Sequence, residues 1–312
     1  IFDTKTGKQI SKWWYHIYKY GLVEKESEYY IAESDNHTEA IFHKDNPNEP
    51  ITGWWDEIYP EGIVQNTSDY YIAYDKNNDK CAIFHKDDPN KPVSQWWEVI
   101  YKLSGLIQGT SNYYIVEKEE QKQFAIFHKD NPHQPVSQWW SKIVDTRGLL
   151  HNESEYYIVR NNEHQYAIFH KNKPNEPITQ WWEMIYADGL LTGQSEYYIA
   201  KNKDNKYAVF HKDNPDKPVS DWWDRIYEEG LIQGKSKYYV TKEKQKEDLT
   251  FIFHVDNPKK PIAQKPYFIG LFSGAIQGQS EYYVATNQNT KQAIFHIDNP
   301  DKPISQWWQW ID

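Results

Sequence analysis

The sequence predicts a mainly β tandem-repeat protein of about seven repeats of 41–44 residues, each a β-hairpin plus one short helix. Two recurring signatures lead to this prediction. The first is a pair of adjacent tryptophans, which takes up 14 of the 15 tryptophans and begins at Trp13, Trp54, Trp96, Trp139, Trp181, Trp222 and Trp307. The second is a pair of adjacent tyrosines, which begins at Tyr29, Tyr70, Tyr113, Tyr156, Tyr197, Tyr238 and Tyr282. Repeats of this length override the two or three domains that 312 residues would otherwise suggest.

Each tyrosine pair opens a predicted β-hairpin. In the copy at residues 197–211, the run Tyr-Tyr-Ile-Ala is followed by a polar stretch rich in Asn and Lys, and then by Tyr-Ala-Val-Phe-His. Two aromatic and β-branched runs around such a turn are typical of a hairpin, and a loop with Asp-Asn-Pro follows. Because both faces of these strands are apolar, each hairpin needs its own helix on one face and a neighbouring repeat on the other.

The segment around each tryptophan pair, such as residues 94–101, is predicted to be a helix of about two turns. Ser94 is a suitable N-cap, and Glu98 suits the positive end of the helix dipole. In five of the seven copies the second tryptophan precedes an Ile-Tyr by three and four residues, which places the three on one helical face. Glycines such as Gly105 then follow, as at helix C-termini. A strand is the competing interpretation, and Pro60 ends either element.

The repeats divide the single predicted domain, residues 1–312, into an N-terminal half repeat (1–26), the repeats proper (27–281) and a C-terminal partial repeat (282–312). An irregular unit is expected at about residues 242–278, where the hairpin is longer and residues 265–269 stand in place of a tryptophan pair. The tryptophan half occurs eight times if the degenerate copy near Tyr267 is counted, and the tyrosine half seven times. This excess favours an open superhelical array, with a closed seven-bladed β-propeller as the alternative. Because the chain begins within a repeat and without a methionine, we expect either a removed upstream segment or a trimmed mature form.

The layout of residues 206–231, and most clearly of residues 1–8 (Ile-Phe-Asp-Thr-Lys-Thr-Gly-Lys), resembles that of WG-repeat (KWG) proteins. The resemblance covers nearly the whole chain in layout but is loose in letters, because the family's Trp-Gly is Tyr-Ala here and its Tyr-Asp is Trp-Trp followed by Asp or Glu. It implies a divergent bacterial β-rich repeat protein with a binding or scaffolding role. The family carries no catalytic residues to transfer.

Composition excludes some classes of partner. The net charge of −10 and a pI near 5.7 argue against nucleic acid and anionic membranes, which both need a basic face. No apolar run approaches the roughly 18–20 residues of a membrane span. We expect an extracellular or cell-surface location, with the cytoplasm as the open alternative, because a single cysteine, Cys81, is compatible with either.

No motif predicts catalysis, a cofactor or a metal site. A histidine ends the second strand in seven copies, at His43, His85, His128, His170, His211, His254 and His296. None has a second His or Cys at ligand spacing, so each is expected to cap the turn that follows. The Asp/Asn loops lack the ligand pattern of a calcium loop, and 105–109 lacks that of a phosphate loop. We therefore expect a chain that is not an enzyme.

The expected function is a non-catalytic interaction protein that binds another protein or copies of itself, with an extracellular filament as one form. One tryptophan of each pair is expected in the core. The first tryptophans are the candidates for partner or glycan contact: Trp54, Trp96, Trp139, Trp181 and Trp222. The candidate assembly ends are Ile1, Phe2, Trp307, Trp308 and Trp310. A lectin that stacks sugars on exposed tryptophans is the alternative.

Overall fold

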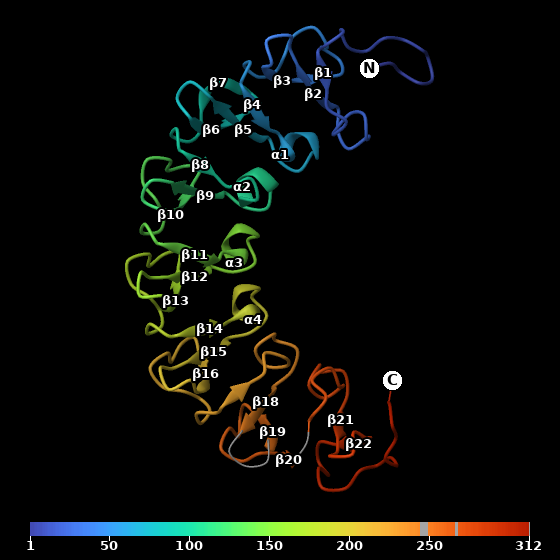
Figure 1. Ribbon diagram of the computed structural model, residues 1–312, viewed down its shortest axis with the longest axis vertical. Helices are drawn as coiled ribbons and strands as arrows, with labels where there is room; N and C mark the ends of the chain where they lie inside the picture. The colour runs from blue at the N-terminus through green and yellow to red at the C-terminus, as the bar shows by residue number, and fades with distance from the viewer. Residues whose placement is uncertain (244–248, 266–267, 312) are drawn as a thin grey trace. The chain divides into compact units, whose positions relative to one another are not determined.

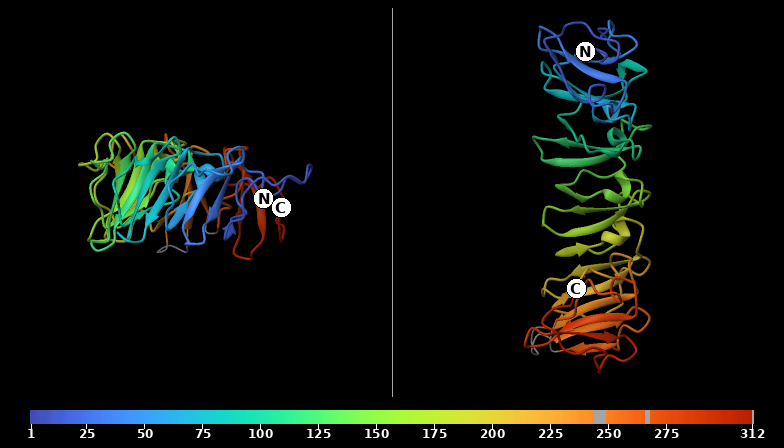
Figure 2. Two further views of the ribbon diagram at one scale, coloured as in Figure 1. Left: turned by 90° about the horizontal axis from the view of Figure 1, so that it is seen from above. Right: turned by 90° about the vertical axis from the view of Figure 1, so that its right-hand side faces the viewer.

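The computed structural model describes residues 1–243, 249–265 and 268–311, and it is a series of small antiparallel sheets (Figure 1). Each tyrosine pair opens the first strand of a hairpin, as predicted. The hairpins are β2 (Tyr29–Glu33) with β3 (Glu39–His43), β5 (Tyr70–Asp75) with β6 (Lys80–His85), β9 (Tyr113–Lys118) with β10 (Gln123–His128), β12 (Tyr156–Arg160) with β13 (Tyr166–His170), β15 (Tyr197–Lys201) with β16 (Tyr207–His211), β18 (Tyr238–Glu243) with β19 (Leu249–His254), and β21 (Tyr282–Thr286) with β22 (Gln292–His296). Their strands run side by side in every view (Figure 2).

A third strand joins six of these hairpins, and it precedes the hairpin in the chain. These strands are β1 (His16–Ile17), β4 (Glu57–Tyr59), β8 (Val99–Ile100), β11 (Lys142–Asp145), β14 (Met184–Tyr186) and β17 (Arg225–Ile226). Two further strands, β7 (Asp88–Pro92) and β20 (Ala263–Lys265), pair with the second strand of their hairpins. One-turn helices follow four of the third strands: α1 (Glu61–Val64), α2 (Gly105–Gln108), α3 (Arg147–Leu150) and α4 (Asp188–Leu191).

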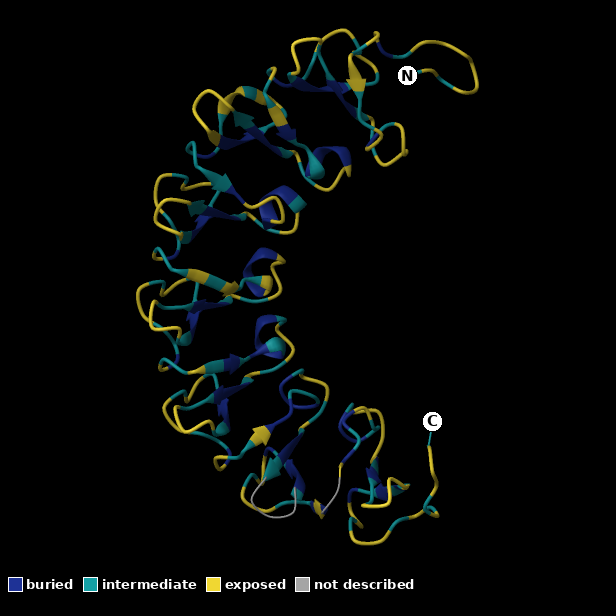
Figure 3. Ribbon diagram, viewed as in Figure 1, coloured by how far each residue is buried: buried dark blue, intermediate teal, exposed yellow. Residues whose placement is uncertain are grey.

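The chain forms two compact units, and each is described by itself. Unit 1 comprises residues 1–143 and 149–152, and unit 2 comprises residues 144–148 and 153–312. The middle of each inner hairpin is buried and the turns are exposed (Figure 3).

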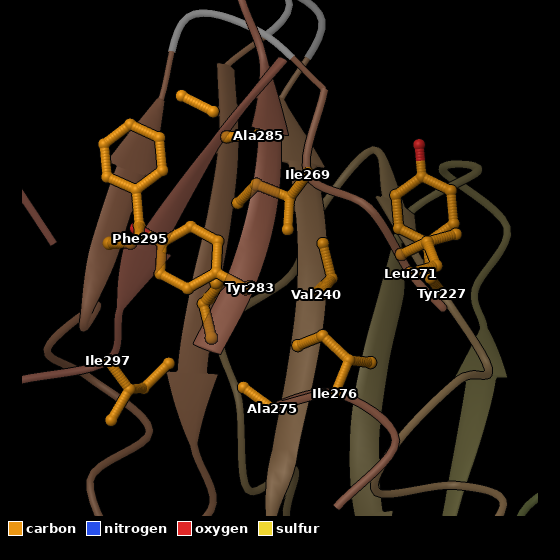
Figure 4. Close-up of a cluster of buried hydrophobic side chains, with 13 residues drawn as sticks. Tyr227, Val240, Ile269, Leu271, Ala275, Ile276, Tyr283, Ala285, Phe295 and Ile297 are labelled. Carbon is orange, nitrogen blue, oxygen red and sulfur yellow. The ribbon is translucent and has the colours of Figure 1, made fainter. Parts of the chain in front are cut away.

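The two apolar faces of a hairpin are covered from opposite sides, as expected. On one face of the β15–β16 hairpin, Tyr198 packs with Leu190 of α4 and with Ile158 of the preceding hairpin. On the other face, Ile199 packs with Ile232 and Tyr239 of the following repeat. The last cluster of unit 2 repeats this arrangement around Tyr283 and Phe295 (Figure 4). Serial stacking therefore builds the core, because no repeat can bury its hairpin alone.

The helix predicted over the tryptophan segment is wrong, and the competing strand is right. We call this segment, from the tryptophan pair to the third strand, the link. In the link at residues 54–59, the Trp55 N–H donates to the Glu39 carbonyl at 3.0 Å, and the Glu39 N–H donates to Trp55 at 2.7 Å. Ile58 then pairs with Ala73 of the next hairpin. The link thus connects two consecutive sheets, because pairing with both satisfies backbone groups that a short helix would leave open at its ends.

The serine or threonine before each tryptophan pair is not a helix cap. The Ser94 hydroxyl accepts a hydrogen bond from the Ile83 N–H at 2.9 Å and donates one to the Gln95 carbonyl at 2.7 Å. The Thr52, Ser137, Thr179, Ser220 and Ser305 hydroxyls accept the same bond from the second strand of their own repeats. The hydroxyl therefore accepts the strand N–H in place of a backbone carbonyl of a neighbouring strand, at the point where the link leaves the sheet.

The glycines predicted at helix C-termini lie inside the one-turn helices. A Cβ on Gly62 would lie 2.6 Å from the Ser68 Cβ and closer still to the carbonyl oxygen of Ile107 in α2. Gly105, Gly148 and Gly189 meet the carbonyl of the next repeat in the same way. The glycine therefore permits close approach of successive repeats.

The irregular unit departs from the others at the expected place. Lys244–Asp248 and Pro266–Tyr267, on which part of this expectation rests, lie outside the described residues. Ala263 pairs directly with Ile252, and Lys265 lies opposite Thr250 just as Trp223 lies opposite Tyr207 in the preceding repeat. Lys265, not Tyr267, is therefore the counterpart of a second tryptophan.

Candidate interaction site

Successive repeats are joined by an aromatic junction of three rings. At the junction of the first and second hairpins, the Trp55 ring lies 5.1 Å from Phe84 and 5.7 Å from Trp96, centroid to centroid. Phe84 and Trp96 are 5.9 Å apart, and Tyr71 stacks on the other side of Phe84 at 5.6 Å. We call the second tryptophan of one repeat, with the phenylalanine and first tryptophan of the next, the junction trio.

The junction trio recurs with nearly the same geometry. Trp14 lies 4.9 Å from Phe42 and 5.6 Å from Trp54. Matching trios are formed by Trp97 with Phe127 and Trp139, and by Trp182 with Phe210 and Trp222. Tilted and edge-on aromatic pairs at such distances are attractive beyond their apolar burial.

The first tryptophans, predicted as contact residues, are therefore part of the junctions between repeats. Trp54 and Trp222 remain 39% and 37% exposed, whereas Trp96, Trp139 and Trp181 are half-buried. The second tryptophans from Trp14 to Trp223 are also half-buried, so the pair shares the buried surface between its members. The expectation that one tryptophan of each pair lies in the core is therefore only partly correct, and the contact role of the first tryptophans stays a prediction.

The N-terminal half repeat presents two members of a trio without the third. Phe2 and Trp13 lie 6.1 Å apart in an edge-on arrangement, as Phe84 and Trp96 do. Phe2 is 51% and Trp13 is 82% exposed. Ile1, a predicted end residue, instead packs against the first hairpin cluster, and its N-terminal ammonium group donates to Ser11 Oγ at 2.7 Å.

The C-terminal repeat presents an exposed second tryptophan, which is the trio member that Phe2 and Trp13 lack. Trp308 bridges to Gln292, as the second tryptophans from Trp55 to Trp223 do to their own hairpins, and it is 54% exposed. Trp310 is 72% exposed and borders a groove of about 580 Å³ whose lining includes Phe268, Phe272 and Ile294. Trp307 is half-buried and packs on Phe295 at 6.0 Å, so it is an inner residue and not an end.

The irregular unit replaces one tryptophan of a trio with a buried cation. Lys265 is 6% exposed, and its ammonium lies 4.6 Å from the centre of the Phe295 ring, where the other repeats have an indole. Burial lowers the pKa of this lysine, and Asp301 partly opposes that shift. The missing tryptophan pair was visible in the sequence, but the burial of this particular lysine was not, because register decides which residue faces the ring.

Replacing Lys265 with methionine is expected to raise the free energy of unfolding at neutral pH by about 1–3 kcal/mol, because it removes a buried charge and keeps the volume. The folded pKa lies below the ordinary value of about 10.4, so the unfolded state binds more protons between the two values. Wild-type stability should therefore rise with pH across that alkaline window, and the variant should lose this rise. Lys259→Met, at an exposed position, is the control for urea unfolding across pH; equal effects of the two substitutions would contradict the prediction.

The strand-end histidines cap their turns, as predicted. His43 Nδ1 accepts the Asp45 N–H at 3.3 Å, and the other six histidines accept the corresponding N–H at 3.1 to 3.3 Å. The other ring nitrogen of His43 lies 3.3 Å from Glu28, and the ammonium of Lys44 lies 3.0 Å from the same carboxylate. Ligand-type atoms come together in two groups of side chains: Glu28, His43 and Asp45, and Glu196, His211 and Asp213. In each group a lysine ammonium already pairs with both carboxylates.

None of the helices in the described part of the chain is long and apolar enough to span a membrane.

Comparison with known proteins identifies no family. No family model and no curated protein matches the chain. Among solved structures, Hsv2 of Kluyveromyces lactis is similar at 10% identity and a TM-score of 0.31, over 91% of this chain and 94% of that one. The computationally designed protein Ika8 is similar at 6% identity and a TM-score of 0.32, over 89% and 83% of the two chains. At these TM-scores the likeness carries no inference about fold or function.

Proposed function

We propose that this chain is a non-catalytic interaction protein that associates head to tail with copies of itself. In this proposal Trp308 of one copy docks on Phe2 and Trp13 of the next and completes a junction trio between chains. The observation that carries it is the pair of exposed partial trios, one at each end, which together contain the three ring types of every complete inner junction.

The exposed aromatic surface at the two ends favours a second copy of this chain over an unrelated partner. Trp13 is more than twice as exposed as its inner counterpart Trp54, at 82% against 39%. Leaving large aromatic surfaces in water is unfavourable at about 25 cal/mol per Å² of apolar area. A head-to-tail contact that does not close into a ring would extend into an open filament.

The contact is expected to be weak. An inner junction also contains a tyrosine that stacks on the phenylalanine, as Tyr71 stacks on Phe84, whereas Trp13 is the one aromatic neighbour of Phe2 among the described residues. A smaller interface of this kind is typical of transient association. Assembly should therefore depend on protein concentration.

Sedimentation velocity across two orders of magnitude in concentration tests the proposal. Wild-type protein should shift to larger species as concentration rises, and Trp13→Ala or Trp308→Ala should each remain monomeric. A mixture of these two variants should form dimers and stop there, because each contributes one intact end. Leu103→Ala, which removes a 76% exposed side chain elsewhere, is the control and should assemble normally.

A wild-type protein that stays monomeric at every concentration would overturn self-association. Quenching of tryptophan fluorescence by members of a glycan panel would then favour the carbohydrate-binding alternative. Small-angle scattering of the monomer would separate an open array of repeats from a closed seven-bladed propeller.

A further inference from the structure

A cavity of about 480 Å³ lies in unit 1, between the first two links, and it is independent of the end faces. The lining includes five carboxylates and no basic side chain: Glu24, Glu26, Glu39, Glu57 and Glu61. Three tyrosines, Tyr18, Tyr20 and Tyr59, complete much of its wall. The cavity is thus both strongly acidic and aromatic.

Its deepest carboxylate is held in a fixed position. Glu39 is 8% exposed, its Oε2 accepts the Ile58 N–H at 2.8 Å, and its Oε1 accepts the Tyr18 hydroxyl. Burial and this carboxylate raise the pKa of Tyr18, so the phenol stays a hydrogen-bond donor to Glu39. Oε2 of Glu61 is buried and has no hydrogen-bond partner among the described residues. An acceptor of this kind, left without a donor, is unfavourable until a donor arrives.

The next repeat shows which chemical group packs against the equivalent tyrosine, Tyr59, on the ring that also lines this cavity. There the ammonium of Lys102 lies 3.6 Å from the centre of the Tyr59 ring, in a close cation–π contact. Tyr59 is the counterpart of Tyr18. One repeat before Lys102, the equivalent position is occupied by Pro60. In unit 2, the guanidinium of Arg147 in α3 pairs with Asp145 at 2.7 Å and with Asp188 of α4 at 2.6 Å.

We propose that the cavity between the first two links binds an alkylammonium group, of the kind that a lysine side chain or a free polyamine carries. Lys102 supplies a cation against Tyr59, whereas Pro60 takes the equivalent position beside Tyr18, in a cavity lined by five carboxylates. Lys19 lies on the rim, 3.5 Å from Glu24, and Glu39 and Glu26 already accept hydrogen bonds, so Glu57 and Glu61 are the carboxylates of the lining that we assign to the ligand. An ammonium against Tyr18 would then gain both cation–π attraction and the field of these carboxylates.

Isothermal titration calorimetry with spermidine, a lysine-rich peptide and N-acetyl-lysine amide tests the proposal at two salt concentrations. All three ligands should bind more weakly at high salt, and the side-chain-acetylated form of the amide, which has no charge, should not bind. Tighter binding of the peptide than of spermidine would indicate a protein partner, and the reverse order a free polyamine. Absence of binding by all three, or equal binding of the uncharged form, would overturn the proposal.

Two variants localise the site. The triple change Glu24→Gln, Glu57→Gln and Glu61→Gln should weaken binding about tenfold, whereas Glu119→Gln, Glu120→Gln and Glu163→Gln, with the same change in net charge at exposed positions, should leave it unchanged. Pro60→Lys restores the lysine of the later groove and should compete with the ligand, again lowering its affinity. Equal effects of the two triple variants would place the binding outside this cavity.

Discussion

Replacing Gly62 with alanine is expected to lower the free energy of unfolding by about 3 kcal/mol, which is large for the addition of one methyl group. The new Cβ would overlap the Ile107 carbonyl oxygen and the Ser68 side chain, and both belong to well-packed parts of the structure. Because the obstacle includes backbone of the following repeat, relief requires the two repeats to separate. Urea unfolding followed by tryptophan fluorescence measures the change.

Gly53→Ala is the matched control for this prediction. A Cβ at Gly53 meets only the side chain of Trp55, at 3.2 Å, and that ring can shift by a few tenths of an ångström. Its cost should stay below about 1 kcal/mol. If Gly62→Ala proved as mild as Gly53→Ala, the close approach of successive helices would not limit the packing of the repeats.

Phe127→Ala is expected to cost about 4 kcal/mol, because it removes the ring at the centre of a junction. Phe127 is 1% exposed and lies 5.1 Å from Trp97, 5.6 Å from Tyr114 and 6.1 Å from Trp139. The cavity would sit among large rigid rings that cannot collapse into it. Since each repeat contacts only its neighbours, unfolding should also become less cooperative, with the two halves of the chain separating into distinct transitions.

Phe2→Ala provides the comparison for Phe127→Ala. Phe2 is 51% exposed and has Trp13 as its aromatic neighbour, so the same deletion should change stability by less than about 1 kcal/mol. It should nevertheless weaken self-association, whereas an inner phenylalanine acts on folding. A large stability loss for Phe2→Ala would show that the N-terminal ring is part of the folded core.

The hairpins were predictable because their signal repeats. Tyr198 and Phe210 are paired across the two strands of their hairpin. Their rings stack at 5.5 Å, and both side chains are buried. Seven near-copies of one pattern average out the ambiguity of any single stretch. The turn-capping role of the histidines followed from their position between a strand and a proline loop.

The links were not predictable from local periodicity. Trp55, Ile58 and Tyr59 have helical spacing, yet Trp55 pairs with one hairpin and Ile58 with the next. Tertiary pairing overrides a signal of only eight residues. The role of the Ser94 hydroxyl was predicted wrongly as a helix N-cap for the same reason. Its hydrogen-bond partner, Ile83, lies eleven residues away in the chain.

The candidate interaction residues were only partly predictable. Phe2, Trp308 and Trp310 are exposed as expected, but Ile1 and Trp307 are packed within their own repeats. The acidic cavity was not predictable because its glutamates come from the turn after β1, from β3, from β4 and from α1, and only the register of β1, β2 and β4 brings them together. One signal of the cavity was present in the sequence: Pro60 occupies the position that Lys102 occupies in the next repeat.

Electron microscopy of the purified protein across a concentration series tests the central claim most directly. Head-to-tail association predicts filaments that lengthen with concentration and that are lost on deletion of residues 304–312, which removes Trp308 and Trp310. Particles of one size at every concentration, identical for the full chain and the deletion, would contradict it.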